Sequence, residues 1–275
     1  MESNLKEKLT KAAKEMRVDI LKMSLRCGAM GAHMGGSLSA VDILAVLYLE
    51  FMRPGQNGRD FDQRDRFIMS KAHSVMAQYA ALKQAGMLTQ DEIDHAMVHN
   101  DLLFKHPKMN LQKGIEFSGG SLGQGLPLGV GTAIALKRKG YDQSRVYVMV
   151  GDGECDEGSI WEAAALAGHR KLSNLTVIVD QNCLQNDGKT QEIIDKSRMA
   201  RRWEAFGFEV VPADGHDVES IYEALSHKSQ QPIAIIAKTI KGKGVSFAEN
   251  VVDWHAAYLT QELYDQAMAE QEDGQ

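Results

Sequence analysis

The stretch RVYVMVGDGECDEGSIWEAAALAGHRKLSNLTVIVDQNCL, residues 145–184, contains two short apolar runs separated by one helical pattern. Residues 146–150 and 175–179 are rich in valine and isoleucine, and the apolar residues of 159–171 recur at helical spacing. A strand, a helix and a second strand in this order predict a βαβ unit, in which the two strands run parallel.

The same alternation continues toward the C-terminus. The sequence predicts helices over residues 198–206 and 218–227 and strands over residues 209–211 and 233–237. Repeated βαβ units indicate an α/β fold, a mostly parallel sheet with helices on both faces. After Ile240 we expect only a loop and one helix.

The first half of the chain is predicted to be mainly helical. The long segment 101–120 has no clear period and is predicted to be a loop, which in a compact domain is often functional. Glycines crowd the start of the helix predicted over 122–139, which suggests that another backbone or a ligand approaches it closely. The other predicted helices are 5–27, 39–52 with Ser39 as its N-cap, one following Ser70–His73, and 89–97.

Length and composition are those of an ordinary globular protein. The 275 residues are 44% hydrophobic and 25% charged, so one domain spanning residues 1–275 is the default expectation. A net charge of -6 without any basic block gives no reason to expect nucleic-acid binding.

Cysteine usage and the N-terminus bear on the compartment. Cys27, Cys155 and Cys183 are odd in number and far apart, which suggests neither a disulfide framework nor a zinc site and fits a reducing compartment. The charged, amphipathic start resembles neither a signal peptide nor a membrane span. We therefore expect a cytoplasmic protein that does not bind membranes.

Oxygen-bearing side chains follow the two strands of the first βαβ unit. Asp152 stands between Gly151 and Gly153 after the first strand, and Asn182 follows the second, 30 positions later. Ligands of such sheets bind beyond the carboxyl ends of the strands, so these side chains should converge. With the carbonyl oxygen of Leu184 they form a ligand set suited to Mg²⁺, with Ca²⁺ or Mn²⁺ as options, and leave coordination positions for diphosphate oxygens.

GDGECDEG, followed by VDQNCLQNDG, resembles the thiamine-diphosphate motif, and the helix SIWEAAALAGHRKL between them is similar to its transketolase form. A bare GDG is a weak signal because glycine and aspartate are common in turns. An ordinary turn with Asn182 as a turn-former is the competing interpretation, but the full pattern at this spacing favours the cofactor. The resemblance implies thiamine diphosphate and the fold of its diphosphate-binding (PP) domain.

Further motifs in family order extend the resemblance over nearly the whole chain. AHMGGS (32–37), RDRFIMSKAH (64–73), His106-Pro107 and SGGSLGQG (118–125) are similar to the histidine elements and the glycine-rich cofactor loop of transketolases. By similarity, His33 and His106 would contact the ketose and His73 would lie by the diphosphate. The glycine-rich loop would bring further cofactor-binding residues, namely Ser121, Leu122 and Gly123.

Two more residues carry expectations from the resemblance. His255 ends a segment similar to a histidine loop near the substrate, but Ala256-Ala257 follows it where the family usually has His-Gly. Glu157 stands where transketolases carry a glutamate that links two cofactor sites across a subunit interface, although a solvated glutamate at a helix start is the alternative. Structural or surface roles are expected for the remaining histidines, His95, His99, His169, His216 and His227.

The resemblance also implies that half of the active site is missing. Transketolases are more than twice this length, and the glutamate that activates the cofactor belongs to a pyrimidine-binding domain absent here. We therefore expect a partner subunit that carries the pyrimidine-binding and C-terminal domains, an α2β2 heterotetramer, and ketol transfer between sugars or sugar phosphates.

Three other interpretations remain open at this point. The α subunit of a 2-oxo-acid dehydrogenase shares the GDG motif but not the set of His33, His73 and His106. A relative of deoxyxylulose-phosphate synthase is a further option, although that family is usually one long chain. A non-catalytic α/β binding module would show no ketol transfer even with a partner.

Overall fold

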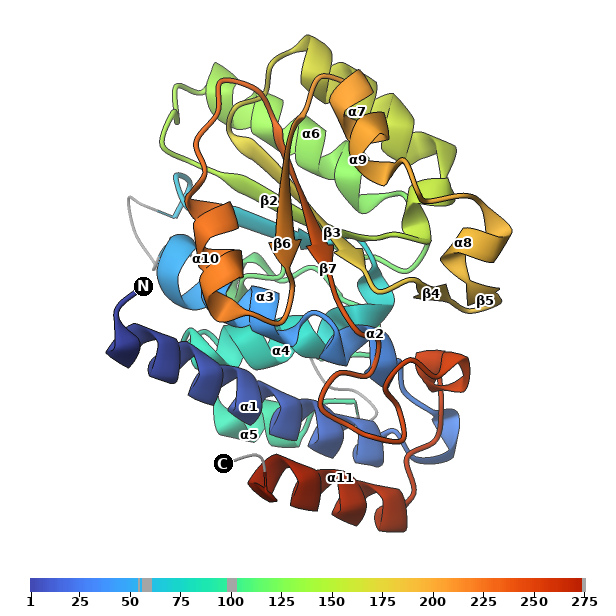
Figure 1. Ribbon diagram of the computed structural model, residues 1–275. Helices are drawn as coiled ribbons and strands as arrows, with labels where there is room; N and C mark the ends of the chain where they lie inside the picture. The colour runs from blue at the N-terminus through green and yellow to red at the C-terminus, as the bar shows by residue number, and fades with distance from the viewer. Residues whose placement is uncertain (54, 56–60, 98–102, 274–275) are drawn as a thin grey trace.

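The computed structural model describes residues 1–53, 55, 61–97 and 103–273, and a five-stranded parallel sheet runs through its centre (Figure 1). His99 and the start of the loop predicted over 101–120 lie outside these ranges. The strand order is β1–β2–β3–β7–β6. The strands are β1 (Arg66–Met69), β2 (Val146–Gly151), β3 (Leu175–Gln181), β7 (Ile233–Lys238) and β6 (Glu209–Asp214). The predicted parallel α/β fold is confirmed.

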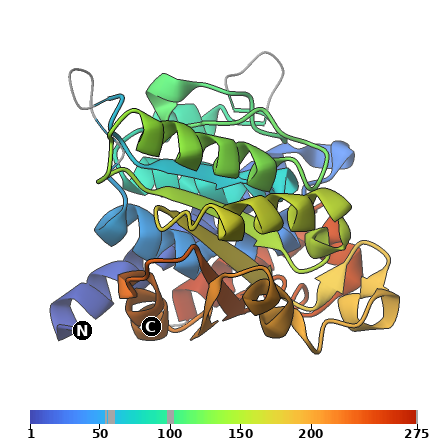
Figure 2. The same cartoon turned by 90° about the horizontal axis from the view of Figure 1, so that it is seen from above.

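Helices cover both faces of the sheet, as predicted, and the period of two along each strand explains why. Ile68 and Val148 point into a core formed with α6, α7 and α9, whereas Phe67 and Met149 point into a second core on the opposite face. Figure 2 shows the layers from above. The first face carries α6 (Gly125–Arg138), α7 (Gly158–His169) and α9 (Met199–Ala205); the second carries α1 (Ser3–Arg26), α3 (Val41–Val46), α4 (Val75–Gln84) and α10 (Val218–Ser226).

Strand register brings the motif residues together. β2 and β3 pair from Val146 with Leu175 to Gly151 with Asp180. The residues after Gly151 and Asp180 therefore leave the sheet side by side at its carboxyl edge. The glycines at the start of α6 serve close packing, because a side chain at Gly125 or Gly129 would collide with Ser70 or Val148 respectively.

Two predictions about local structure are wrong. Strand β1 was not predicted: its four residues, preceded by charged ones, are too short a run to show a period. Ser39 is not an N-cap but lies in αR conformation at the end of α2 (Met34–Leu38), and Ala40 precedes α3. Its hydroxyl donates instead to the buried carboxylate of Asp180, at 2.6 Å, a tertiary contact that local sequence does not reveal.

The helix predicted over 39–52 is interrupted. α3 continues as a π-helical turn over Leu47–Phe51. The helix predicted over 89–97 is reduced to α5 (Gln90–Asp94), which begins with a capping box between Thr89 and Glu92. Three segments were not assigned from the sequence: the hairpin strands β4 (Leu184–Gln185) and β5 (Gly188–Lys189), and α8 (Thr190–Ile193).

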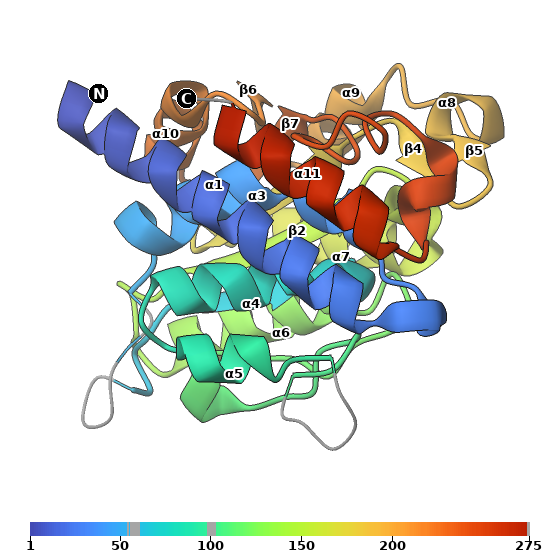
Figure 3. The same cartoon turned by 90° about the horizontal axis from the view of Figure 1, so that it is seen from below.

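The C-terminal segment returns to the N-terminal part of the chain. A 3-10 turn over Val252–His255 leads to α11 (Gln261–Asp273), which lies beside α1 (Figure 3). Between these elements, Ala257 pairs with Ala32 in an antiparallel bridge. None of the helices in the described ranges combines the length and apolar character needed to cross a bilayer.

Candidate active site

The turn after β2 is held by a buried carboxylate that sequence reasoning passed over. Glu154 is 2% exposed and accepts hydrogen bonds from the backbone N–H of Gly123 at 2.9 Å and of Gly151 at 3.1 Å. It also accepts one from the Ser70 hydroxyl at 2.5 Å. Gly123 has φ +76°, a conformation that favours glycine. Glu154 therefore ties the glycine-rich loop to the turn of Gly151.

Asp152 leaves β2 into a buried position at the carboxyl edge of the sheet. Its carboxylate accepts hydrogen bonds from the backbone N–H of Gly153 (3.0 Å) and Cys183 (2.9 Å) and from the Thr190 hydroxyl (3.0 Å). Burial, followed by the negative charge of Asp180, raises the pKa of Asp152 to about 6. A nearby cation would therefore stabilise the ionised carboxylate.

Asn182 and Leu184 lie where the sequence predicted, next to Asp152. The Asn182 side-chain oxygen accepts from the backbone N–H of Leu184 at 3.1 Å. The Leu184 carbonyl oxygen accepts a hydrogen bond from Lys241 Nζ at 3.3 Å. All three predicted oxygen donors thus lie in one neighbourhood, and a lysine ammonium already contacts one of them.

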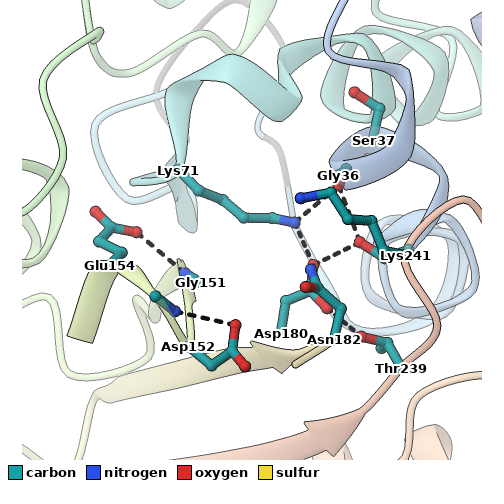
Figure 4. A network of polar contacts seen from close by, with 12 residues as sticks. Gly36, Ser37, Lys71, Gly151, Asp152, Glu154, Asp180, Asn182, Thr239 and Lys241 are labelled. Carbon is teal, nitrogen blue, oxygen red and sulfur yellow. Dashed lines mark hydrogen bonds and ion pairs between the residues drawn. The ribbon is translucent and has the colours of Figure 1, made fainter. Parts of the chain in front are cut away.

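Asp180 is the centre of the polar network shown in Figure 4. It is fully buried and accepts hydrogen bonds from Asn182 Nδ2 at 3.3 Å, from the Thr239 hydroxyl, and from Lys71 Nζ in a buried ion pair. Burial opposes ionisation, but the charge of Lys71 and the hydrogen bonds hold the pKa of Asp180 below its usual value. Lys71 Nζ also donates to the carbonyl oxygen of Gly36 at 2.8 Å.

A cavity of about 310 Å³ connects these groups. Most of the predicted cofactor and metal residues line it, together with two lysines that were not assigned a role. The predicted residues are His73, Leu122, Gly151, Asp152, Gly153, Glu157, Asn182, Leu184 and His255; the unassigned residues include Lys71, Lys241, Glu154 and Gln185. Buried Gln185 Oε1 has no hydrogen-bond partner among the described residues.

Four histidines form a cluster at one end of this cavity. The ring centroid of His33 lies 5.3 Å from that of His73, 5.8 Å from that of His106 and 5.6 Å from that of His255. The His73 and His255 centroids are 5.0 Å apart. The predicted histidine set therefore converges, although His33 and His106 do not line the cavity itself.

Burial and nearby positive charge keep the histidines neutral. Burial, followed by the charges of neighbouring groups, lowers the pKa of His33 and of His255 to about 4, and it lowers the pKa of His73 well below its usual value. Burial and then the charge of Lys71 lower the pKa of Lys241 to about 8. Lys241 Nζ lies 2.8 Å from His255 Nδ1. Because the ammonium is the donor, His255 carries its own proton on Nε2.

Other predicted residues lie at the edge of the cavity. Ser121 is exposed, and Gly123 contacts Glu154 rather than the cavity. Glu157 is exposed at the N-terminus of α7 and lines the cavity mouth. Lys71 and Lys241 could have been identified from the sequence, because each follows a strand at the edge where Asp152 was found.

Larger hollows lie elsewhere on the surface but lack the motif residues. One of about 870 Å³ follows α1 and is lined by lysines and glutamates, and one of about 930 Å³ borders β6 and β7. The smaller cavity is the better candidate because it combines pKa-shifted groups with convergent oxygen donors.

Comparison with known proteins agrees with this site. The family "Transketolase, thiamine diphosphate binding domain" matches residues 7–271. One of the separate subunits of the apulose-4-phosphate transketolase of Phocaeicola vulgatus is 39% identical over 245 residues, 88% of this chain and 86% of that protein. The 6-deoxy-6-sulfo-D-fructose transketolase subunit SqwG of a Clostridium species is 39% identical over 258 residues, covering 92% and 94%.

Solved structures give the same result. The transketolase from Campylobacter jejuni superposes with a TM-score of 0.85 at 29% identity over 99% of this chain, and that from Leishmania mexicana with 0.84 at 30% over 96%. This chain spans only 43% and 41% of those two proteins. The chain therefore belongs to the transketolase family, as a member that corresponds to the thiamine diphosphate binding domain and resembles relatives named as separate subunits.

Proposed function

We propose that this chain is the diphosphate-binding subunit of a two-chain transketolase, which uses thiamine diphosphate and Mg²⁺ to transfer a two-carbon ketol unit from a ketose to an aldose. The observation that carries the proposal is that the four-histidine cluster adjoins the cavity of Asp152 and Asn182. The α subunit of a 2-oxo-acid dehydrogenase, which resembles this chain only around the GDG motif, would not account for that cluster.

Two lysines and the GDG turn suit a diphosphate group. Lys71 and Lys241 are each 2% exposed, yet both line the cavity, so their charges act with little screening by water. Gly153 has no side chain to keep phosphate oxygens away from the backbone. Diphosphate binding would balance the positive charge that the two ammonium groups concentrate here.

The donor set also fits a hard divalent cation. Asp152, Asn182 and the Leu184 carbonyl supply three oxygens, and the unpartnered Gln185 Oε1 is a further buried acceptor. No group of three or more His, Cys, Asp or Glu in the described ranges could hold a metal alone. Diphosphate and water would complete the coordination of Mg²⁺, or of Ca²⁺ or Mn²⁺. Metal binding would displace Lys241 from Leu184 toward the diphosphate.

The histidines would bind and orient the sugar. When bound, thiamine diphosphate supplies the carbon nucleophile that accepts and passes on the two-carbon unit. Neutral His33 and His255 can each accept one hydrogen bond and donate another, which suits neighbouring sugar hydroxyls. His106 would contact the ketose from the far side of His33, and His73 would lie between the sugar and the diphosphate.

Exposed apolar residues beside the cluster support a partner subunit. Met30 is 61% exposed and Tyr258 52% exposed, and they flank the bridge between Ala32 and Ala257. Phe104, 38% exposed, precedes Lys105, whose Nζ donates to the carbonyl oxygen of Met30 at 3.0 Å. A partner that carries the pyrimidine-binding and C-terminal domains would cover these residues.

The remaining parts of the proposal concern assembly and compartment. Residues 1–275 would form one diphosphate-binding domain in an α2β2 heterotetramer, with Glu157 facing a second cofactor site. The three free cysteines, Cys27, Cys155 and Cys183, support a reducing compartment such as the cytoplasm. The relatives are named for different ketoses, which leaves the sugar, phosphorylated or not, to be found by assay.

The test is reconstitution. The chain is co-purified with its partner and assayed with a panel of ketose and aldose pairs, with thiamine diphosphate and Mg²⁺. We expect cofactor-dependent ketol transfer that is lost in Asp152→Ala and retained in Glu162→Ala, an exposed position on α7. Decarboxylation of a 2-oxo acid without ketol transfer would overturn the proposal, as would the absence of both activities in the assembled complex.

A further inference from the structure

His216 lies outside the cofactor cavity but contacts the segment that carries Lys241. It follows β6 in the turn to α10, and its side chain is 14% exposed. Its Nε2 accepts a hydrogen bond from the backbone N–H of Ile240 at 2.7 Å. Its Nδ1 lies 2.8 Å from Asp42 Oδ2. One imidazole therefore connects α3 to the residue directly before Lys241.

The partners define the protonation of this ring. A backbone N–H can only donate, so Nε2 must be the accepting nitrogen, and the proton of neutral His216 is on Nδ1, directed at Asp42. Asp42 is 5% exposed and is also paired with Arg17 of α1. The ring is thus held by a buried carboxylate that is itself fixed between two helices.

Three hydrogen bonds fix the backbone of residues 240–242. Gly242 N–H donates to the Gly35 carbonyl at 3.0 Å, and the Lys241 carbonyl accepts from Asn250 N–H at 2.9 Å. These two bonds are between backbone groups, whereas the third, at Ile240, depends on the His216 side chain. Substitution of His216 can therefore release this segment at one end without touching the cavity.

The position of Lys241 is demanding because its side chain threads past a crowded glycine. A Cβ atom built on Gly35 would lie 3.1 Å from Lys241 Cγ. Beyond this point the ammonium reaches both Leu184 O and His255 Nδ1. A shift of the backbone at residue 240 would move the ammonium away from the cavity, since a buried, tightly packed stem cannot absorb it.

We propose that His216, oriented by Asp42, is a positioning residue that holds the backbone of Ile240 and thereby sets the Lys241 ammonium in the cofactor cavity. This inference rests on the proposed function, because it assigns to Lys241 a role in binding the diphosphate. His216 does not contact the cavity, so its effect is on cofactor affinity and not on a reacting atom.

Two near-isosteric variants separate the two hydrogen bonds. In His216→Asn the side-chain amide can replace Nδ1 and donate to Asp42, but it cannot reach Ile240. In His216→Gln the longer side chain can place an oxygen near the position of Nε2 and accept from Ile240. His227→Asn is the matched control, because His227 also pairs with a carboxylate, that of Glu209, at an exposed site.

The variants are compared in the full chain assembled with its partner. Hydrogen exchange of the Ile240 amide reports the bond, acylation of Lys241 reports its position, and titration with thiamine diphosphate and Mg²⁺ reports affinity. We expect His216→Asn to accelerate exchange about fivefold, the loss expected for one hydrogen bond. It should also speed Lys241 acylation relative to exposed Lys189 and weaken cofactor binding about tenfold, with kcat at saturating cofactor largely kept.

Rescue by His216→Gln, with wild-type behaviour of His227→Asn, would support the positioning role. Equal loss of affinity in the Asn and Gln variants, with unchanged exchange at Ile240, would overturn it and indicate a merely structural histidine. If the wild-type complex binds no thiamine diphosphate, the proposed function fails. In that case exchange and Lys241 acylation still decide whether His216 sets the position of the lysine.

Discussion

The ring centroids of His73 and His255 lie 5.0 Å apart, although one residue follows β1 and the other closes a turn near the C-terminus. His255 joins the cluster despite the departure of Ala256-Ala257 from the family pattern. Ala256 has φ -145° and ψ 103°, an extended conformation that needs no glycine. Ala257 is held by its bridge to Ala32, so the backbone supplies the support that places His255.

This contact predicts a separable role for His255. In His255→Asn the side-chain oxygen can still accept from Lys241, but the Nε2–H directed away from it is lost. We expect kcat/KM for the ketose to fall roughly 100-fold, in the range of one lost acid–base or orienting group, while cofactor affinity changes little. Kinetics with ketose and cofactor varied separately measure both effects. Unchanged ketose kinetics would remove His255 from the sugar site.

The lowered histidine pKa values predict how stability depends on pH. In the folded chain the pKa of His33 and of His255 is about 4, whereas an unfolded histidine titrates near 6.5. Between these values the unfolded chain binds more protons, so the free energy of unfolding falls as pH drops from about 6.5 to about 4. Urea unfolding of the chain without cofactor at pH 7, 6 and 5 tests this. The double variant His33→Asn, His255→Asn should flatten the dependence, and an equally steep one would contradict the assignment.

Asp152 predicts the pH dependence of metal binding. Its pKa of about 6 without metal means that a proton and Mg²⁺ compete for the carboxylate below that pH. We expect Mg²⁺ affinity in the presence of thiamine diphosphate to rise about tenfold per pH unit up to about pH 6, and then to level off. Calorimetric titrations from pH 5 to 8 measure this, with Asp91→Asn as an exposed control. A flat profile across pH 6 would argue against Asp152 as a ligand.

Much of this site could be predicted from the sequence because its residues lie next to recognisable strands. Gly151, Asp152 and Asn182 follow two apolar runs, and parallel strands deliver their ends to one edge. Glu154 and Asp180 were missed for the opposite reason. Each belongs to a motif whose neighbours drew attention, and its importance comes from hydrogen bonds to distant segments.

The missed fold elements have a similar explanation. β1 is recognisable only by its pairing with β2, and the role of Ser39 depends on Asp180, which lies 141 positions away. Tertiary contacts of this kind override local signals such as N-cap preference. His216, expected to be structural, shows the same limit, because its contact with Ile240 is visible only in the fold.

The buried pair of Lys71 and Asp180 predicts strong coupling in stability. Both side chains are at most 2% exposed, so removing either one leaves the other charge buried without its partner. Lys71→Ala and Asp180→Ala should each lower the free energy of unfolding by about 3–5 kcal/mol, measured by urea unfolding without cofactor. The double variant should lose clearly less than the sum of the two losses, because neither charge then remains.

The matched control for this cycle is the exposed pair of Lys189 and Glu192, whose side chains are 68% and 67% exposed and lie 3.2 Å apart. Water and salt screen such a pair, so its coupling should be below about 0.5 kcal/mol. Additive losses at Lys71 and Asp180 would show that the two charges do not depend on each other. Strong coupling would show that Asp180 is what allows a lysine ammonium to be buried beside the cofactor cavity, ready to meet a diphosphate.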